Sequence, residues 1–369
     1  MAYKNWNWLH KDWPQFSYDK TILEKLELQF LQNTGIVIGA VKHIEATSKD
    51  DLLVEIMSNE ALKTSEIEGE MLNRESVQSS IKKNLGFITN TNRIAPAEFG
   101  ISEMMVDLYH NFDKYLSHNQ LFKWHAMLTN GRRDLVDIGC YRTHEDPMQV
   151  VSGRLDKPNI HFEAPPSSRV EEEMEQFISW FNTIHNPKNA NMLPLVKAGL
   201  AHLYFVCIHP FEDGNGRITR ALSDMLLARA DRSNQRFYSM SAQIRKERKG
   251  YYEILEKTQK GNLDITEWIK WFLRCLISAL KATDSILKQV LFKADFWNKH
   301  SKTIINERQS LLINKILDEF DGKLTSSKWA KIAKCSKDTA IRDINDLITK
   351  NILRKEAAGG RSTNYELVK

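Results

Sequence analysis

The hydrophobic positions of this 369-residue chain recur mostly at spacings of three and four. That periodicity places apolar side chains on one face of an α-helix. It is clear between residues 20 and 83, in Leu23, Leu26, Phe30 and Leu31 and again in Leu52, Leu53 and Ile56. From residue 98 to about residue 282 most segments show the same pattern. The sequence therefore predicts a mostly α-helical fold.

One stretch breaks the helical pattern. Residues 149–151 (QVV) and 160–162 (IHF) are short runs of residues that favour strands, and a loop with Gly and Pro joins them. Pro165 and Pro166 follow, ahead of the next helical segment. Two such runs around a turn indicate a β-hairpin. An isolated hairpin in a helical domain should have an exposed edge, and a plain surface decoration is the simplest interpretation.

Two polar stretches, residues 90–96 and 295–310, divide the chain. Polar segments that contain Pro or lack apolar periodicity are typical of joints between structural units. We therefore expect an N-terminal helical segment over 1–95, a helical central domain over 96–290, and a third unit over 305–369.

The third unit has a recognisable order of elements. A helix near residue 311 precedes a short helix capped by Thr325 or Ser326, a tight turn, and the helical stretch TAIRDINDL. Two strands about a Gly359–Gly360 turn would end the chain. Helix, helix, turn, helix and hairpin is the plan of a winged helix-turn-helix domain.

Composition narrows the class of protein. Hydrophobic residues make up 42% and charged residues 27% of the chain, as in globular proteins, and the formal net charge of +5 fits ordinary solubility. The four cysteines lie about 60 residues apart without a CxxC pair, which favours free thiols in a reducing compartment. The N-terminus does not resemble a signal peptide, and no apolar stretch is long enough to span a membrane. We expect a cytoplasmic protein with no membrane contact.

The richest chemistry lies in residues 209–220, HPFEDGNGRITR, between two apolar helical segments. Gly214 and Gly216 let the backbone approach a ligand closely. The N–H groups of Asn215, Gly216 and Arg217 open the following helix, whose N-terminus favours anions. Arg217 and Arg220 lie three residues apart on one helical face, so both can turn towards one phosphate group.

The same loop holds an acid and a base. Asp213 would repel a bound phosphate unless a cation such as Mg²⁺ lay between them. His209 can accept a proton near neutral pH. The loop contains no nucleophilic Ser or Cys. These residues predict the transfer of a phosphate-containing group to an incoming hydroxyl.

All fixed positions of this loop match the signature H-P-F-x-[D/E]-G-N-G-R-x-x-R, so the chain resembles the Fic family. The resemblance covers residues 20–285 and implies a protein adenylyltransferase that moves AMP from ATP to a Ser, Thr or Tyr hydroxyl of a target protein, or of itself. By this resemblance His209 is the general base and Asp213 the Mg²⁺ ligand. Asn215 and the loop amides would hold the α-phosphate, and Arg217 and Arg220 the outer phosphates.

The resemblance also gives the hairpin a role. Fic proteins carry a hairpin flap over the site, and the target segment pairs with its edge. Flap residues would be Val150, Val151, Ile160 and His161.

Residues 64–70, TSEIEGE, match the inhibitory pattern [S/T]-x-x-x-E-[G/N] of self-inhibited Fic proteins through Thr64, Glu68 and Gly69. We expect Glu66 and Glu68 in the last turn of a helix, where the dipole disfavours acids. By the resemblance, Glu68 pairs with Arg220 at the γ-phosphate position and blocks productive ATP binding. In the alternative interpretation the three acids are simply solvated. Self-inhibited Fic proteins often form dimers, so a homodimer is expected.

Two expectations rest on weaker patterns. Tyr251 or Tyr252 could stack on adenine, or could simply pack in the core. In the third unit, Lys337, Thr339 and Arg342 would face the DNA major groove and Arg361 the backbone, if the domain binds DNA as bacterial winged-helix regulators do. Residues 311–369 hold twelve Lys and Arg against eight Asp and Glu, a modest excess. Dimerisation or target docking is the competing use of this unit.

Two other functions stay open at this point. The same site could run in reverse, with Glu68 orienting a water that removes AMP from a modified protein. Alternatively, the chain could be a DNA-binding regulator whose central domain senses a nucleotide.

Overall fold

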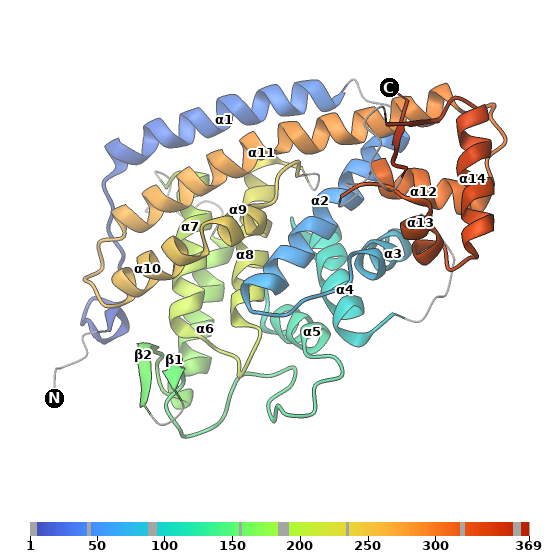
Figure 1. Ribbon diagram of the computed structural model, residues 1–369. Helices are drawn as coiled ribbons and strands as arrows, with labels where there is room; N and C mark the ends of the chain where they lie inside the picture. Colours follow the sequence, from blue (N-terminus) through green and yellow to red (C-terminus); the bar gives the residue numbers. More distant parts are fainter. Residues whose placement is uncertain are drawn as a thin grey trace. The chain divides into compact units, whose positions relative to one another are not determined.

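The computed structural model describes residues 6–42, 46–87, 94–154, 157–183, 192–233, 236–317, 322–356 and 363–368. The chain forms two compact units, residues 1–284 and 285–369, and each is described by itself. The expected segment 1–95 and most of the expected domain 96–290 lie together in the first unit. The prediction of a mostly helical fold with two small hairpins is confirmed (Figure 1).

The first unit begins with a short 3₁₀-helix, Asn7–Leu9, and continues through helices and one hairpin. In chain order these are α1 (Lys20–Lys42), α2 (Ala46–Ile67), α3 (Arg74–Asn84), α4 (Pro96–Asn111), α5 (His118–Leu128), β1 (Gln149–Arg154), β2 (Lys157–Glu163), α6 (Ser167–Asn182), α7 (Pro194–Ile208), α8 (Asn215–Asp231), α9 (Met240–Lys246), α10 (Arg248–Gln259) and α11 (Thr266–Lys299), which continues into the second unit.

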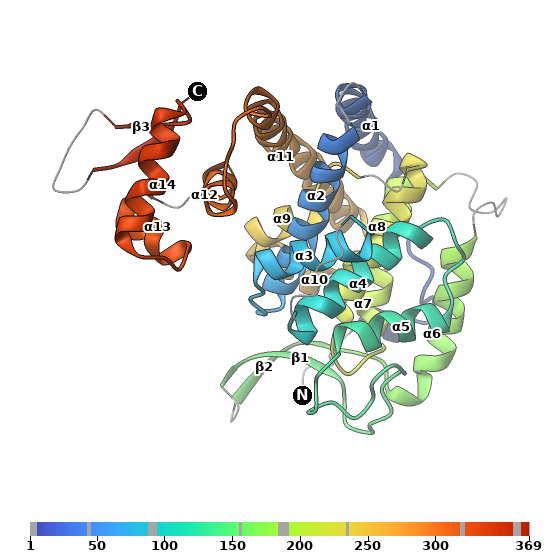
Figure 2. The same cartoon turned by 90° about the vertical axis from the view of Figure 1, so that its right-hand side faces the viewer.

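Helix α7 forms the centre of the first unit. Its sequence is apolar on every side, and nearly all of its residues are buried, as expected for a helix enclosed by others. It packs along α8, and α8 also contacts α2, α4 and α5 (Figure 1). Figure 2 shows α2, α4 and α5 gathered beside α7 and α8. The loop between α7 and α8 is therefore held at both ends by rigid, buried helices.

The end of α2 differs slightly from the prediction. The helix stops at Ile67, so Glu68 lies one residue beyond it rather than in its last turn. Gly69, with φ of +90°, then reverses the chain. The N–H groups of Glu68 and Glu70 both bond to the carbonyl of Ser65, at 3.1 and 3.0 Å. This compact turn holds the three acids of TSEIEGE close to the helix end.

The hairpin is longer than its sequence pattern suggests. Strands β1 and β2 pair in antiparallel fashion from Gln149↔Glu163 to Arg154↔Lys157. Val150 faces Phe162 and Val151 faces Ile160, so His161 is an extra residue, a β-bulge. Phe162 is buried while Val151 is exposed. The hairpin thus has one face on the unit and one face open.

The second unit contains α12 (Glu307–Leu317), α13 (Ser326–Ile332), α14 (Lys337–Thr349), β3 (Leu353–Lys355) and β4 (Tyr365–Leu367). Its core is a cluster that includes Leu312, Trp329, Ile344 and Leu347. The order of elements is the one predicted, and its assignment as a winged helix stays a prediction. The expected Gly359–Gly360 turn and Arg361 lie outside the described residues.

Within the described residues, no helix is both long enough and apolar enough to cross a membrane.

Candidate active site

The loop from His209 to Gly214 bends sharply at both ends. His209 adopts a left-handed conformation, φ of +52°, directly after α7. Gly214 does the same, φ of +80°, directly before α8. A left-handed residue other than Gly costs about 1 kcal/mol or more and persists only where its surroundings hold it. The strained position of His209 is therefore fixed by neighbouring contacts.

Arg142 supplies those contacts, although no motif in the sequence marks it. Its side chain is only 2% exposed. Its Nε donates to the His209 carbonyl at 2.8 Å, and its other nitrogens donate to Ser167 Oγ and to the carbonyl of Pro165. Burial lowers the pKa of Arg142 to about 10, which leaves it charged at neutral pH. Arg142 thereby joins the catalytic-loop candidate to the segment that follows the hairpin.

The imidazole of His209 faces a cavity. Its Nδ1 lies 3.2 Å from the carbonyl of Val206, which favours the tautomer with a proton on Nδ1 and an unprotonated Nε2. Burial lowers the pKa of His209 to about 4. The ring is therefore neutral at pH 7 and able to accept a proton through Nε2.

Asp213 is held by two guanidinium groups. Arg132 Nη1 lies 2.6 Å from its Oδ2, and Arg217 Nη2 lies 3.5 Å from its Oδ1. Burial raises the pKa of Asp213, but Arg217, the Gly214 N–H and Arg132 lower it by more, so the net shift is downward. Asp213 is thus a carboxylate at neutral pH. Arg132, from the loop after α5, has no motif in the sequence that marks it.

Side-chain amide and carboxylate groups fasten the loop itself. Asn215 Oδ1 accepts from the Phe211 N–H at 2.9 Å, and Asn215 Nδ2 donates to the Phe211 carbonyl at 2.7 Å. Glu212 Oε2 accepts from the N–H groups of Val136 and Asp137. Because its side-chain amide bonds to the loop backbone, Asn215 would contact a ligand through its backbone N–H at the start of α8. His125 stacks on Phe211, with ring centroids 4.3 Å apart, and this contact supports the loop.

A carboxylate already occupies the space over the first turn of α8. A Cβ on Gly216 would lie 2.1 Å from Glu68 Oε1. Only the absence of a side chain at this position lets the Glu68 carboxylate approach so closely. An anion at a helix N-terminus is favoured by the unpaired N–H groups and the helix dipole. Glu68 therefore lies where the sequence pattern predicts a phosphate.

Arg220 is almost fully enclosed by the TSEIEGE segment. It is 1% exposed. Its Nη2 lies 2.5 Å from Glu68 Oε1, its Nε donates to Thr64 Oγ1 at 2.6 Å, and its Nη2 also donates to the Thr64 carbonyl at 3.0 Å. Burial lowers the pKa of Arg220, but the Glu68 carboxylate together with Tyr251 and Tyr252 raises it, with a net rise. Thr64 and Glu68, the two side-chain positions of the predicted pattern, thus meet the same guanidinium.

The other two acids also have basic partners. Glu70 Oε2 accepts from Arg217 Nη1 at 2.7 Å. Glu66 pairs with Lys63 at 2.8 Å and with Arg245 at 3.5 Å, outside the cavity. The interpretation in which these acids are merely solvated is therefore wrong. The Glu70–Arg217 pair was not foreseen, because the inhibitory pattern ends at Gly69.

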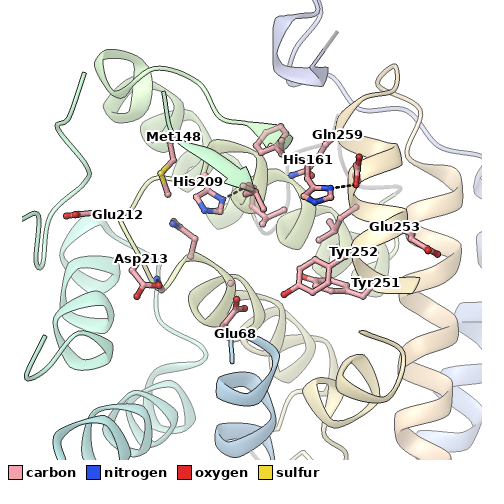
Figure 3. A pocket seen from close by; sticks show the side chains of 18 of the residues that line it. Glu68, Met148, His161, His209, Glu212, Asp213, Tyr251, Tyr252, Glu253 and Gln259 are labelled. Atoms are coloured by element: carbon pink, nitrogen blue, oxygen red, sulfur yellow. Dashed lines mark hydrogen bonds and ion pairs between the residues drawn. The ribbon is translucent and has the colours of Figure 1, made fainter. Parts of the chain in front are cut away.

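The loop after α7, Glu68 and the hairpin border a cavity of about 550 Å³ (Figure 3). Figure 3 shows His209 and Asp213 on one side, Glu68 at the α8 end, and His161, Tyr251 and Tyr252 opposite. The remaining wall includes Met148, Val150, Phe162, Leu255 and Gln259. The expected site residues from the loop, the TSEIEGE segment and the hairpin are therefore brought together, with an apolar side and a charged side.

The two tyrosines differ. Tyr251 is 2% exposed and its hydroxyl lies 2.9 Å from His202 Nε2, so it mainly packs in the core. Tyr252 is 37% exposed and Arg248 stacks on its ring at 5.4 Å. Tyr252 is the better placed of the two for a planar ligand.

The donor set fits one kind of metal ion. Among the described residues, no group of three or more His, Cys, Asp or Glu side chains could hold a metal. Asp213 offers a single carboxylate beside the backbone N–H groups at the start of α8. Mg²⁺ commonly binds through one or two carboxylates together with substrate phosphates and water. Asp213 therefore fits Mg²⁺ that arrives with a nucleotide, rather than a resident structural metal.

The DNA-contact candidates lie in the second unit. Lys337 and Arg342 on α14 are exposed, while Thr339 is half-buried and its hydroxyl pairs with Ser336 at 2.9 Å. Their exposure leaves them available to a partner.

Two protein-family models match parts of this chain. Residues 115–227 match the model of the Fic/DOC family, and residues 6–87 match a Domain of unknown function (DUF4172). The chain is 32% identical over 133 residues to a protein adenylyltransferase Fic of Drosophila ananassae, covering 36% of this chain and 24% of that protein. It is 30% identical over 152 residues to the protein of the same name from Drosophila melanogaster, covering 40% and 29%. The chain thus spans about a quarter of the length of these curated relatives.

Solved structures share the fold. A Fic family protein from Desulfovibrio desulfuricans G20 has a TM-score of 0.56 and 19% identity, covering 95% of this chain and 97% of that one. Fic-1 from C. elegans has a TM-score of 0.50 and 19% identity, covering 73% and 72%.

Proposed function

We propose that this chain, whose residues 115–227 form a Fic/DOC domain, is a protein adenylyltransferase that transfers AMP from ATP to Ser, Thr or Tyr hydroxyls of a target protein and of itself. One observation carries the proposal. A neutral imidazole, a carboxylate and a helix N-terminus line a single cavity, and the first two turns of the same helix carry the buried Arg217 and Arg220. A base, an anion cradle and an acid that fits Mg²⁺ are what transfer of a nucleotidyl group to a hydroxyl requires.

His209 would act as the base. Its Nε2 would take the proton of the incoming hydroxyl as the oxygen attacks the α-phosphorus, and pyrophosphate would leave. The lowered pKa of His209 suits an acceptor that is unprotonated at neutral pH. The backbone N–H groups at the start of α8 would stabilise the charge on the α-phosphate, and Arg217 and Arg220 would hold the outer phosphates.

Asp213 would hold Mg²⁺ beside the phosphates of the bound nucleotide. The bound ion would neutralise charge on the phosphates of the leaving group. For this Asp213 must give up its contact with Arg132 Nη1, which lies 2.6 Å from its Oδ2.

The nucleoside would occupy the apolar side of the cavity. Tyr252 supplies an exposed ring, and Gln259 supplies an amide among apolar neighbours. A planar base can stack on the ring and hydrogen-bond the amide. The exposed edge of the β1–β2 flap would receive the extended target segment by strand addition.

Glu68 would inhibit the reaction. Its carboxylate pairs with Arg220 and lies over Gly216, so a correctly placed triphosphate would have to displace it. The resting enzyme would then bind ATP only unproductively.

His209→Ala tests the assignment of the base. The variant is expected to lose AMP transfer, measured with labelled ATP. Transfer at the wild-type rate would remove His209 from the mechanism.

A second candidate reaction uses the same cavity. Glu68 lines the cavity near His209, and a carboxylate in that place could orient a water against an AMP-modified side chain. Incubation with an AMP-bearing target separates the two. Removal of AMP that is lost without Glu68 favours the hydrolase. Removal at the same rate with and without Glu68 contradicts it.

A regulator that binds DNA is the third candidate, favoured by the exposed Lys337 and Arg342 on α14. Binding to duplex DNA that weakens with salt and is lost in Arg342→Ala would support it. Binding unaffected by Arg342→Ala would contradict contact through this helix.

A further inference from the structure

The first described residues of the chain contact the hairpin at the cavity wall. Trp8 Nε1 donates to the carbonyl of Glu163, the last residue of β2, at 2.7 Å. Trp6, 2% exposed, packs edge-on against Phe162 of the same strand, with ring centroids 5.4 Å apart. Phe162 lines the cavity. Residues 6–8 therefore hold β2 where it borders the cavity.

The same short segment also contacts the helix that precedes His209. Asn7 is fully buried, and its Nδ2 donates to Cys207 Sγ at 3.2 Å. Cys207 belongs to the last turn of α7, two residues before His209. Three consecutive residues thus touch both the hairpin that would present a target and the helix end that would present the base.

Further contacts keep this segment in place. Residues 7–9 form the 3₁₀-helix and contact α10, beside which the dark-blue start of the chain lies in Figure 1. The guanidinium carbon of Arg169 on α6 lies 5.5 Å from the centre of the Trp8 ring, and Lys260 Nζ lies 5.8 Å from that of Trp6. Cations within about 6 Å of an aromatic ring are attracted to its face. The segment is therefore attached to α6, α7 and α10 as well as to the hairpin.

The hairpin needs such support. A two-stranded hairpin alone is only marginally stable in water. Among the hairpin residues whose burial is described, Phe162 alone is buried. A further attachment is the contact of His161 Nδ1 with Glu256 Oε2 on α10, at 2.6 Å. With so few attachments, the loss of the Trp8 hydrogen bond should loosen the hairpin measurably.

We propose that residues 6–8 act as a brace that fixes the hairpin relative to His209, and that Trp8 is a positioning residue for the transfer of AMP. The inference rests on the proposed function, in which the hairpin receives the target segment and His209 takes the proton of its hydroxyl. Reacting atoms must approach within about 3–3.5 Å, and a misplacement of about 1 Å can cost about 100-fold in rate. A brace that touches both the hairpin and the end of α7 keeps this distance fixed. It gives a role to the first residues of the segment 6–87, which matches a domain of unknown function.

The competing interpretation is that these aromatic residues only cover apolar surface of the unit. Trp13 provides the matched comparison, because its Nε1 donates to Glu173 Oε2 on α6 at 2.8 Å. Trp8→Phe and Trp13→Phe each remove one indole hydrogen bond and keep an aromatic ring. The bond of Trp13 goes to a helix rather than to the hairpin, so the pair separates a brace from simple coverage.

The first experiment does not depend on ATP. Hydrogen–deuterium exchange is followed by mass spectrometry on peptides from β1 and β2. The expected result for Trp8→Phe is exchange about tenfold faster than in the wild-type chain, the size expected for one lost hydrogen bond. Trp13→Phe should leave the exchange of these peptides unchanged. Equal exchange of the hairpin in the two variants overturns the brace.

The second experiment places Trp8→Phe in the Glu68→Gly form and measures two quantities. Affinity for α,β-methylene-ATP with Mg²⁺ should stay within about twofold, while labelling of lysate proteins from α-labelled ATP should fall at least about tenfold. An unchanged labelling rate, or equal losses of nucleotide affinity and labelling, overturns the positioning role. If the Glu68→Gly form itself labels no protein, the proposed function is contradicted, and the exchange result still decides on the brace.

Discussion

Glu68 Oε1 lies 2.5 Å from Arg220 Nη2, although the two residues are separated by 152 positions in the chain. The arginine is buried and the carboxylate borders the cavity, so the pair joins the turn after α2 to the second turn of α8. One guanidinium cannot hold Glu68 and an outer phosphate in the same place. The arrangement gives the proposed inhibition a physical basis, because a nucleotide bound as proposed would first have to break this ion pair.

A second ion pair has the same consequence for Arg217. Glu70 Oε2 lies 2.7 Å from Arg217 Nη1. Glu70→Ala should free this arginine and raise AMP self-modification, by less than Glu68→Gly, because Glu68 lines the cavity and Glu70 does not. A double Glu68→Gly/Glu70→Ala form should exceed either single change. The measurement is incorporation of label from α-labelled ATP.

Glu66→Ala is the matched control for Glu70→Ala. Glu66 belongs to the same segment but pairs with Lys63 and Arg245 rather than with Arg217 or Arg220. It should leave the rate of self-modification unchanged. Equal effects of the two substitutions would show that the segment acts only through its fold.

Arg132 should compete with divalent metal for Asp213. Its Nη1 lies 2.6 Å from Asp213 Oδ2. Arg132→Ala removes this positive partner, so Mn²⁺ should bind at least about tenfold more tightly, equivalent to about 1.4 kcal/mol. Free and bound Mn²⁺ can be counted by electron paramagnetic resonance, without any turnover.

Arg133→Ala provides the control for that measurement, since Arg133 is an exposed neighbour and its loss changes the net charge equally. It should leave Mn²⁺ affinity nearly unchanged. Asp213→Asn should abolish the gain in affinity. If Arg132→Ala binds Mn²⁺ no better than the wild-type chain, the competition does not occur.

The pH dependence follows from the buried imidazole. Burial lowers the pKa of His209 to about 4, so the basic form persists well below neutral pH. The acid limb of kcat/KM in the Glu68→Gly form should therefore lie near pH 4 rather than near 6.5, the ordinary value for histidine. An acid limb between pH 6 and 7 would contradict the neutral, buried base.

The same shift affects stability with a definite sign. Below pH of about 6.5 the unfolded chain protonates this histidine while the folded chain does not, so the unfolding free energy falls as pH falls towards 4. His125 and His202 are also buried and have lowered pKa values, so they act in the same direction. Thermal unfolding between pH 7 and 4.5 should show a falling midpoint.

Arg142 should be essential for the position of His209. Replacement by Ala leaves several buried carbonyls without a donor, and each such group costs about 1–3 kcal/mol. Arg142→Ala should lower the unfolding free energy by about 3 kcal/mol or more. The expected result for Arg142→Lys is a smaller loss of stability with a clear loss of AMP transfer, because one ammonium cannot replace the fork that holds the His209 carbonyl. Full activity in Arg142→Lys would exclude this positioning role.

The sequence predicted the 209–220 loop well because its chemistry is contiguous. His209, Asp213 and Arg217 lie within nine residues, and two apolar helical segments mark the loop's borders. Contacts between distant segments were harder to foresee. Arg132 and Arg142 resemble ordinary surface arginines in the sequence, and only the fold brings them to Asp213 and His209. Their partners are 81 and 67 residues away.

The hairpin shows a similar limit. Its two short β-rich runs were visible, but a β-bulge depends on cross-strand register, which a period-two pattern does not reveal. The hydrogen bond between His161 and Glu256 could therefore not be predicted from the sequence. The exact end of α2 was also missed by one residue, which is the usual uncertainty at helix ends.

The most direct test of the proposed AMP transfer compares two labelled forms of ATP. The Glu68→Gly form is incubated with Mg²⁺ and with ATP labelled either on the α- or on the γ-phosphate, alone and with lysate. We expect protein to become labelled from α-labelled ATP only, and faster than with the wild-type chain. The double Glu68→Gly/His209→Ala form should give no labelling. Labelling from γ-labelled ATP, or no labelling above that of the wild-type chain, would contradict the proposed AMP transfer.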